Sequence, residues 1–359
     1  MALTITKDSA SAFTTSNTDL VSSCRLSDTK FAVIYKDITN SDCRVVVATI
    51  SGTSITFGTS VQVYSGVIAS CSIDKLDTDK IVVHYQINSD YNIYCKVATI
   101  SGTTPSFGSA YGNYYSATES VRVVSYNTDY FALLYNERLV RGASVSGTVI
   151  SFAAGASSLR SPAYVPFGGF FLDTDKIICY CGGSTASPRF FLVSFSGTTA
   201  TVGTEDYFIS GQTGQMNVDA CCALSSSKIL VYFHRANASR VVCATISGDA
   251  FTWGTIYEYS NTQYTTCSVR KVSDSKAILL NPELKNVGTL AISGTTITSN
   301  SDAADYESGY MPGGSADYLG NDYFQISFRD GGDSGKGKSI IGYGVAPVVA
   351  NTSAFFQLF

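Results

Sequence analysis

Alternating apolar and polar residues surround a Ser-Gly pair at regular intervals along the chain. In "VATISGTSITFG" (47–58) the alternation runs into the pair and resumes after it, and "VATISGTTPSFG" (97–108) repeats the pattern. Alternation with a period of two is typical of a strand with one buried face, and Gly adopts the positive φ of a tight turn at little cost. Each copy therefore predicts a β-hairpin. The pairs begin at Ser51, Ser101, Ser146, Ser196, Ser247 and Ser293.

A second pattern precedes each hairpin. It consists of a short turn rich in Ser, Asp, Asn or Thr, followed by a run of apolar residues, as in "LDTDKIVVHY" (76–85). Turn residues followed by an unbroken apolar run predict a strand that is buried on both faces. Seven such segments begin at residues 26, 76, 126, 172, 224, 272 and 319.

Together the two patterns define a repeat of roughly 48 residues with four antiparallel strands, which is typical of a β-propeller blade. The chain has seven of the polar turns but only six Ser-Gly pairs, so the last unit lacks a fourth strand. "LTITKDSASAF" (3–13) resembles a fourth strand and would supply it. We therefore predict an all-β, seven-bladed β-propeller of four-stranded antiparallel blades over residues 1–344, closed into a ring by the N-terminal strand.

The composition narrows the range of possible functions. The net charge is −4 and only 14% of the residues are charged, which argues against a nucleic-acid partner. No apolar run is long enough to span a membrane, and the first residues contain no apolar signal core, which favours synthesis in a cytoplasm. The ten cysteines show no CxxC spacing, so we expect buried thiols, no metal site and no cofactor.

Catalytic motifs are not evident in the sequence. The chain has only two histidines. His84 alternates with buried neighbours in "IVVHYQ", which favours a core imidazole, and His234 is expected at an exposed loop without a nucleophile motif beside it. "RDGGDSGKGK" (329–338) lacks the spacing of a phosphate-binding loop. These observations predict a protein that is not an enzyme and has no catalytic residue.

A binding face is predicted where long, varied loops gather. The loops between the second and third strands and between successive units emerge on one side of the predicted ring, and they are rich in Tyr, Ser, Gly and Asn. Tyr offers a rigid apolar ring and a hydroxyl group at small entropic cost, so these loops are suited to stacking on sugar rings or anchoring a protein; alternatively, about half of the tyrosines pack between blades. The candidate ligand-binding residues are Tyr111, Tyr114, Tyr115, Tyr257, Tyr259, Tyr264, Tyr306, Tyr310, Arg235 and Arg329.

The last stretch, residues 345–359, is an apolar tail beyond the predicted ring. Exposing its large side chains to water costs about 1.5–3 kcal/mol each, so the tail is expected to dock on a partner or to pack back on the propeller. The residues that would dock are Phe355, Phe356, Leu358 and Phe359.

The "ATISGTxITFG" repeat resembles units of virion proteins of tailed bacteriophages, especially tail-associated and fibre-like propellers. The resemblance implies a non-enzymatic virion protein, made in the host cytoplasm, that assembles with other virion structural proteins and binds a host surface glycan or a partner through its Tyr-rich face. The chain has no trimerising stalk. Two alternatives remain: a purely structural virion or assembly subunit docked by its tail, and a propeller polysaccharide hydrolase or lyase.

Overall fold

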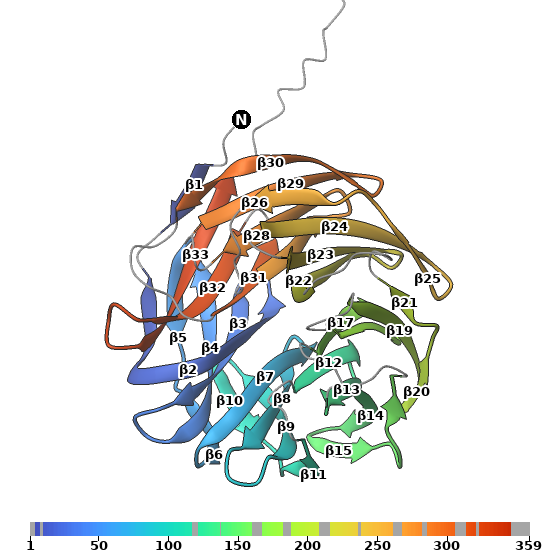
Figure 1. The fold of residues 1–359 in the computed structure, drawn as a ribbon. Helices are drawn as coiled ribbons and strands as arrows, with labels where there is room; N and C mark the ends of the chain where they lie inside the picture. The colour runs from blue at the N-terminus through green and yellow to red at the C-terminus, as the bar shows by residue number, and fades with distance from the viewer. Residues whose placement is uncertain are drawn as a thin grey trace, which may run out of the picture.

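The computed structural model describes residues 4–7, 10–116, 121–136, 138–159, 167–181, 188–207, 216–235, 238–260, 268–281, 286–305, 314–320 and 323–345. Every regular element in these ranges is a β-strand, which confirms the all-β prediction. The strands form antiparallel sheets arranged around a common middle (Figure 1). In the described ranges, no helix has the length and apolar character needed to cross a membrane.

The first strand of each repeat faces the middle of the molecule. Each first strand contacts the first strand of the following repeat, and β31 contacts β2. The polar turn predicted after each of them ends the strand. These strands are β2 (Ser11–Ser27), β7 (Ile68–Asp77), β12 (Arg122–Asn127), β17 (Phe167–Asp173), β22 (Met216–Ser225), β27 (Ser268–Ser273) and β31 (Gly314–Gly320).

The second and third strands form the buried centre of each sheet, because the apolar runs of the sequence occupy them. The second strands are β3 (Lys30–Asp37), β8 (Lys80–Ile87), β13 (Tyr130–Tyr135), β18 (Lys176–Cys181), β23 (Lys228–Arg235), β28 (Lys276–Asn281) and β32 (Tyr323–Asp330). The third strands are β4 (Asp42–Ser51), β9 (Asn92–Ser101), β14 (Leu139–Ser146), β19 (Arg189–Ser196), β24 (Ala238–Ser247), β29 (Asn286–Ser293) and β33 (Lys336–Val345).

The outer strand of most sheets is divided in two at the position that Phe57-Gly58 occupies in the first repeat. On β4, for example, Ala48 pairs with Phe57 and Val45 pairs with Val61. The first halves are β5 (Ser54–Phe57), β10 (Thr104–Phe107), β15 (Val149–Phe152), β20 (Thr199–Val202) and β25 (Ala250–Trp253). The outer strand β30 (Thr296–Asp305) is undivided. The second halves are β6 (Val61–Ser65), β11 (Tyr111–Tyr115), β16 (Ser157–Ser158), β21 (Asp206–Tyr207) and β26 (Tyr257–Ser260).

The glycine of the Phe-Gly pair is required by the neighbouring repeat. A Cβ at Gly58 would lie 2.5 Å from Oγ1 of Thr103, and a Cβ at Gly108 would lie 2.5 Å from Oγ1 of Thr148. Each threonine is the third residue of the next Ser-Gly-Thr turn. The repeated signature thus records the close approach of one sheet to the next, in addition to the bend that the sequence predicts.

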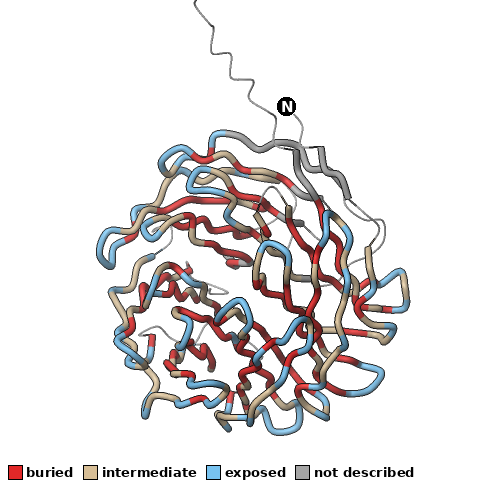
Figure 2. The backbone as a smooth tube through the Cα atoms, turned by 180° about the vertical axis from the view of Figure 1, so that it is seen from behind, coloured by how far each residue is buried: buried red, intermediate tan, exposed pale blue. Residues whose placement is uncertain are grey.

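The apolar core lies between successive sheets. Val47 of β4, Ile73 of β7 and Val83 of β8 belong to one buried cluster that joins two repeats. Figure 2 shows buried residues along the strands and exposed residues at the turns. Packing between sheets therefore supplies the apolar burial that a single sheet lacks.

The N-terminal segment meets the last repeat. β1 (Thr4–Lys7) pairs antiparallel with β33, with Thr4 opposite Val345. The start of β2 also pairs with β33, where Ser11 lies opposite Ser339. These pairings join the first and last repeats into one nine-stranded sheet.

Candidate functional site

A cavity of about 1110 Å³ is lined mainly by residues of the first strands of the repeats. These strands lie around the middle of the molecule in Figure 1. We call this cavity the central channel. Hydroxyl groups, arginines and carboxylates are present in its lining beside apolar side chains. It is therefore suited to hold a small polar molecule rather than an apolar one.

Strand pairing places one residue of each first strand opposite the third residue of the second strand. The charged residues at this position come from β27, β31 and β7. These strands follow one another around the channel, with β2 between β31 and β7. The opposite side of this layer is apolar. The layer consists of Cys24, Asp74, Val124, Phe170, Cys222, Arg270 and Asp317, and all of them line the channel.

Asp317 is held by a cation. Nε of Arg270 donates to its Oδ1 at 3.1 Å, and Oγ of Ser23 lies 3.5 Å from its Oδ2. Burial raises the pKa of the Asp317 carboxyl, and the Arg270 charge opposes that rise.

Asp74 has no cation bonded to its carboxylate among the contacts described. Its oxygens accept the backbone N–H groups of Ser125 at 2.7 Å and Lys75 at 2.8 Å. Burial raises the pKa of the Asp74 carboxyl to about 6, the N–H donors oppose the rise, and the negative charge of Asp317 adds to it. We call Asp74 and Asp317 the channel carboxylates.

Next to Asp74 on the same strand, Ser72 bonds a buried histidine. Oγ of Ser72 lies 2.6 Å from Nδ1 of His84, and the N–H of Val123 donates to the same Oγ at 3.1 Å. His84 is fully buried, as the sequence predicts. His234, expected at an exposed loop, is also buried, because β23 continues to Arg235 and pairs His234 with Ser239.

The predicted tyrosine site is largely part of the packing between repeats. The ring of Tyr114 stacks on Tyr135 with centroids 5.8 Å apart, and the guanidinium of Arg141 lies 4.4 Å from its centroid. Tyr115 is 61% exposed. Tyr111, Tyr257 and Tyr259 are half-buried against apolar clusters.

The remaining predicted residues do not converge on these tyrosines. Arg235 ends β23, and its carbonyl accepts Nη1 of Arg240 at 3.0 Å. Arg329 is half-buried on β32, and its buried Nε has no hydrogen-bond partner within the described ranges. The others lie outside the described residues: Tyr264, Tyr306, Tyr310, Phe355, Phe356, Leu358 and Phe359.

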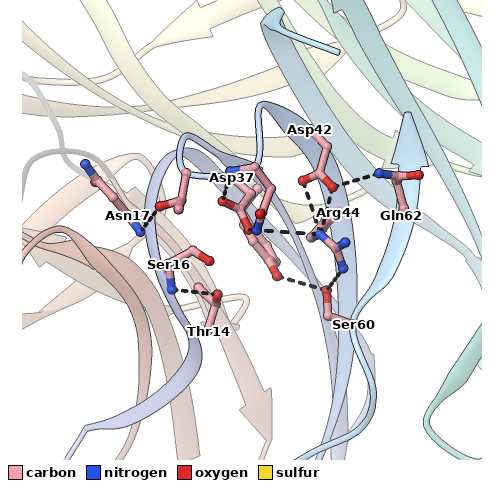
Figure 3. Close-up of polar contacts among 11 residues, drawn as sticks. Thr14, Ser16, Asn17, Asp37, Asp42, Arg44, Ser60 and Gln62 are labelled. Carbon is pink, nitrogen blue, oxygen red and sulfur yellow. Dashed lines mark hydrogen bonds and ion pairs between the residues drawn. The ribbon is translucent and has the colours of Figure 1, made fainter. Parts of the chain in front are cut away.

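A second group of buried carboxylates lies at the β3–β4 hairpin, and we call it the hairpin cluster. Nε of Arg44 bonds both oxygens of Asp42, at 3.1 and 3.0 Å, and lies 4.0 Å from Asp37 (Figure 3). Asn40 donates to Asp37, and Gln62 donates to Asp42. These charges are bonded on several sides, so the cluster stabilises the hairpin.

Comparison with known proteins found similarity of fold only. No protein-family model and no curated protein sequence matches the chain. Solved structures do match. The periplasmic gluconolactonase of Pseudomonas aeruginosa is 12% identical with a TM-score of 0.59, over 80% of this chain and 86% of that one. A putative 6-phosphogluconolactonase from Bacteroides uniformis is 6% identical with a TM-score of 0.58, over 79% and 85%.

A further match is a β-propeller domain from Myceliophteria thermophila, 8% identical with a TM-score of 0.58, over 94% of this chain and all of that domain. The chain is a β-propeller repeat protein. At these identities the likeness shows the fold of the propeller alone.

These findings contradict the prediction of a non-enzymatic virion appendage that binds host glycan. Two of the similar propellers bear the names of enzymes, and none of the three is a bacteriophage tail protein. The sequence argument was wrong because the Ser-Gly-Thr and Phe-Gly signature follows from contact between neighbouring sheets, as at Gly58 and Thr103, and carries no information about a virion. The comparison agrees better with the last alternative, a propeller hydrolase.

Asp74 and Asp317 were missed by sequence reasoning. Both stand two residues before the last apolar residue of the first strand, at a position that is Val124 or Phe170 in other repeats. Aligning the seven segments would have revealed charges at a position that is otherwise apolar or Cys. The search for known catalytic motifs does not detect such a signal.

Proposed function

We propose that this propeller is a hydrolase whose active site is the central channel, and that it opens small cyclic esters such as sugar lactones. The observation that carries the proposal is the Asp74 carboxyl, half-buried in the channel wall with a pKa of about 6. Carboxylates perturbed in this way are typical of groups that exchange protons during catalysis. The names of two similar propellers supply the substrate class.

The proposal includes a ring of seven blades closed by the N-terminal strand. The succession of contacts among first strands, with β31 against β2, supports a complete ring. The pairing of β1 and of Ser11 with β33 supports closure by the N-terminal segment. Closure would hold the two channel carboxylates in place, since they come from the last repeat and the second.

Each charged group of the layer has a role in ester hydrolysis. Ionised Asp74 accepts a proton from a water molecule that attacks the ester carbonyl, and the C–O bond of the ring then breaks. Arg270, fixed by Asp317, contributes positive charge near the developing oxyanion and the carboxylate product. Arg122, exposed in the channel lining, adds a second positive charge.

The test is hydrolysis of glucono-δ-lactone by the purified protein, followed by proton release at constant pH. The wild type should exceed the uncatalysed rate, and Asp74→Asn should lose about 100-fold or more of that excess. Asp77→Asn is the matched control, because it makes the same change at an exposed residue of β7 outside the channel lining. Equal rates for wild type and Asp74→Asn, or no excess for the wild type, would refute the proposal.

A further inference from the structure

Four serines line the channel at equivalent positions, two residues before the charged layer: Ser22, Ser72, Ser268 and Ser315. Strand pairing sets a different residue opposite each one. Ser22 lies opposite Ile34, Ser268 opposite Leu280 and Ser315 opposite Ser327. Ser72 lies opposite His84, so one serine of the four has an imidazole beside it.

The hydrogen bonds around His84 specify its tautomer. Nε2 of Gln86 donates to the carbonyls of Ser116 at 2.8 Å and Tyr91 at 3.2 Å, so Oε1 of Gln86 is an acceptor. Oγ of Ser70, 3.1 Å from that oxygen, must donate to it. The lone pairs of Ser70 then accept Nε2–H of His84, at 3.3 Å. Nδ1 carries no proton and faces the hydroxyl of Ser72.

His84 is also kept in the neutral form. Burial lowers the pKa of its imidazole well below the usual value, and the charge of Arg122 lowers it further. A neutral imidazole with a free Nδ1 at 2.6 Å from a serine hydroxyl is the arrangement of a base and its nucleophile. The N–H of Val123 binds one lone pair of Ser72 Oγ and orients the other.

We propose that Ser72 and His84 form a serine–histidine dyad in the channel wall, which takes the acyl group of the substrate covalently. The inference rests on the proposed hydrolase function. It replaces direct attack by water on the ring ester with attack by Ser72, and it leaves Asp74 to activate the water of the second step. Ser70 and Gln86 are positioning residues, because they act on the imidazole and not on the substrate. Ser70 has the orienting place that a carboxylate has in a serine–histidine–aspartate triad, and Gln86 orients Ser70 in turn.

The reaction proceeds in two balanced steps. Oγ of Ser72 attacks the lactone carbonyl carbon, its proton passes to Nδ1 of His84, the ring C–O bond breaks, and the leaving alkoxide takes that proton from His84. Water then attacks the acyl-serine and its proton passes to Asp74. The acyl C–O bond to Ser72 breaks, Asp74 returns the proton to the Ser72 oxygen, and the hydroxy acid leaves. Asp74 and Ser72 both bond the backbone of β12, so they lie on the same face of β7.

The experiment uses a fluorophosphonate probe on the full chain. Attack by Ser72 forms an O–P bond, fluoride leaves, and the proton goes to His84. We expect one covalent adduct on the intact protein, mapped by peptide mass spectrometry to Ser72. Ser22→Ala is the matched control and should keep the adduct, since Ser22 lines the same channel opposite Ile34.

Two further variants separate activation of Ser72 by His84 from access of the probe to Ser72. Ser72 is only 4% exposed, so labelling measures directly whether the channel admits the probe to it. His84→Asn should slow labelling by about 100-fold or more if the imidazole is the base. Ser72→Ala should abolish it, with the thermal unfolding midpoint measured to verify folding. Labelling of His84→Asn at the wild-type rate would refute the dyad.

The outcomes distinguish the two proposals. No adduct on the wild type, together with Asp74-dependent lactone hydrolysis, overturns the dyad and leaves the proposed function intact. An adduct on Ser72 without lactone hydrolysis supports the dyad and overturns the substrate class. An adduct at another serine overturns the dyad as well.

Discussion

Carboxylates withdrawn from bulk water lie in two regions of this molecule, buried in the hairpin cluster and half-buried in the channel wall, and their partners differ. In the hairpin cluster, Arg44 bonds both oxygens of Asp42 and lies beside Asp37, while Asn40 donates to Asp37 and Gln62 also donates to Asp42 (Figure 3). In the channel, Asp74 accepts backbone N–H groups, and burial raises its pKa to about 6.

The difference in partners separates a charge that stabilises the fold from a charge that can take part in proton transfer. A buried carboxylate bonded by an arginine and amides holds the chain in place. A half-buried carboxylate with backbone N–H donors and no bonded cation, such as Asp74 with its pKa of about 6, is close to its own titration near neutral pH and exchanges protons easily. Burial therefore indicates a functional group only when it is considered together with the partners.

The largest expected effect is on stability, at the hairpin cluster. Arg44→Ala leaves two buried carboxylates without their cation and should lower the free energy of unfolding by about 3 kcal/mol. Urea unfolding measures this change. Arg44→Lys keeps the charge and should recover part of the loss. A loss below about 1 kcal/mol for Arg44→Ala would remove the contrast between the two regions.

The second prediction concerns the pH dependence of lactone hydrolysis. Because Asp74 acts as a base, kcat/KM should rise with pH through about 6 and fall about tenfold from pH 7 to pH 5. The profile of Arg44→Lys should keep the same midpoint, since Arg44 lies outside the channel lining. A midpoint near pH 4 would mean that the channel does not perturb Asp74.

The third prediction concerns stability against pH at Asp74. Its folded pKa of about 6 lies above the unfolded value of about 3.9, so the folded state binds more protons between these limits. The contribution to stability is complete below about pH 4 and is lost as the pH rises through about 6. Because Asp74 is only half-buried in the cavity wall, solvent screening should limit the loss to about 1–2 kcal/mol.

Urea unfolding of wild type and Asp74→Asn at pH 4.5 and pH 7 measures this loss. The variant should gain stability relative to the wild type as the pH rises. A difference between the two proteins that does not change with pH would show that Asp74 is not destabilised by its burial.

The smallest effect is expected at Cys24, which lies between the channel carboxylates. Burial raises the pKa of its thiol, and the charges of Asp74 and Asp317 raise it further, so it should react slowly with a water-soluble disulfide reagent at pH 8. Asp74→Asn removes one of those charges and should speed the reaction a few-fold. Cys243, on a third strand, is the internal control, and its rate should not change.

Much of the fold follows from the sequence, because the pattern that defines it is local. The Ser-Gly turns require positive φ, which Gly52 and Gly102 adopt at 61° and 60°. The apolar runs after the polar turns, such as 81–85, become buried second strands, and this pattern is also local in sequence. The division of the outer strand at Phe-Gly was anticipated only as a bend, because contact with Thr103 is not local in sequence.

The candidate site was not predictable in the same way. Tyr114 has the composition of a binding loop, yet the structure packs it between Tyr135, Phe152 and Arg141. Asp74 and Ser72 look like ordinary strand residues, and nothing in their neighbours in sequence distinguishes them from Asp77. Their environment depends on which strands surround the channel, and those strands are some fifty or more residues apart.

By itself, the sequence determined the strands, the turns and the repeat, since each depends on the conformational preferences of a few adjacent residues. Only the tertiary structure decided which charges are neutralised and which are not. Arg44 reaches Asp42 two residues away, whereas Asp74 accepts a hydrogen bond from β12 and interacts with the charge of Asp317 on the far side of β2. The physical reason is that desolvation and Coulomb interactions depend on distance in space, and the repeat brings distant positions of the chain together around one cavity.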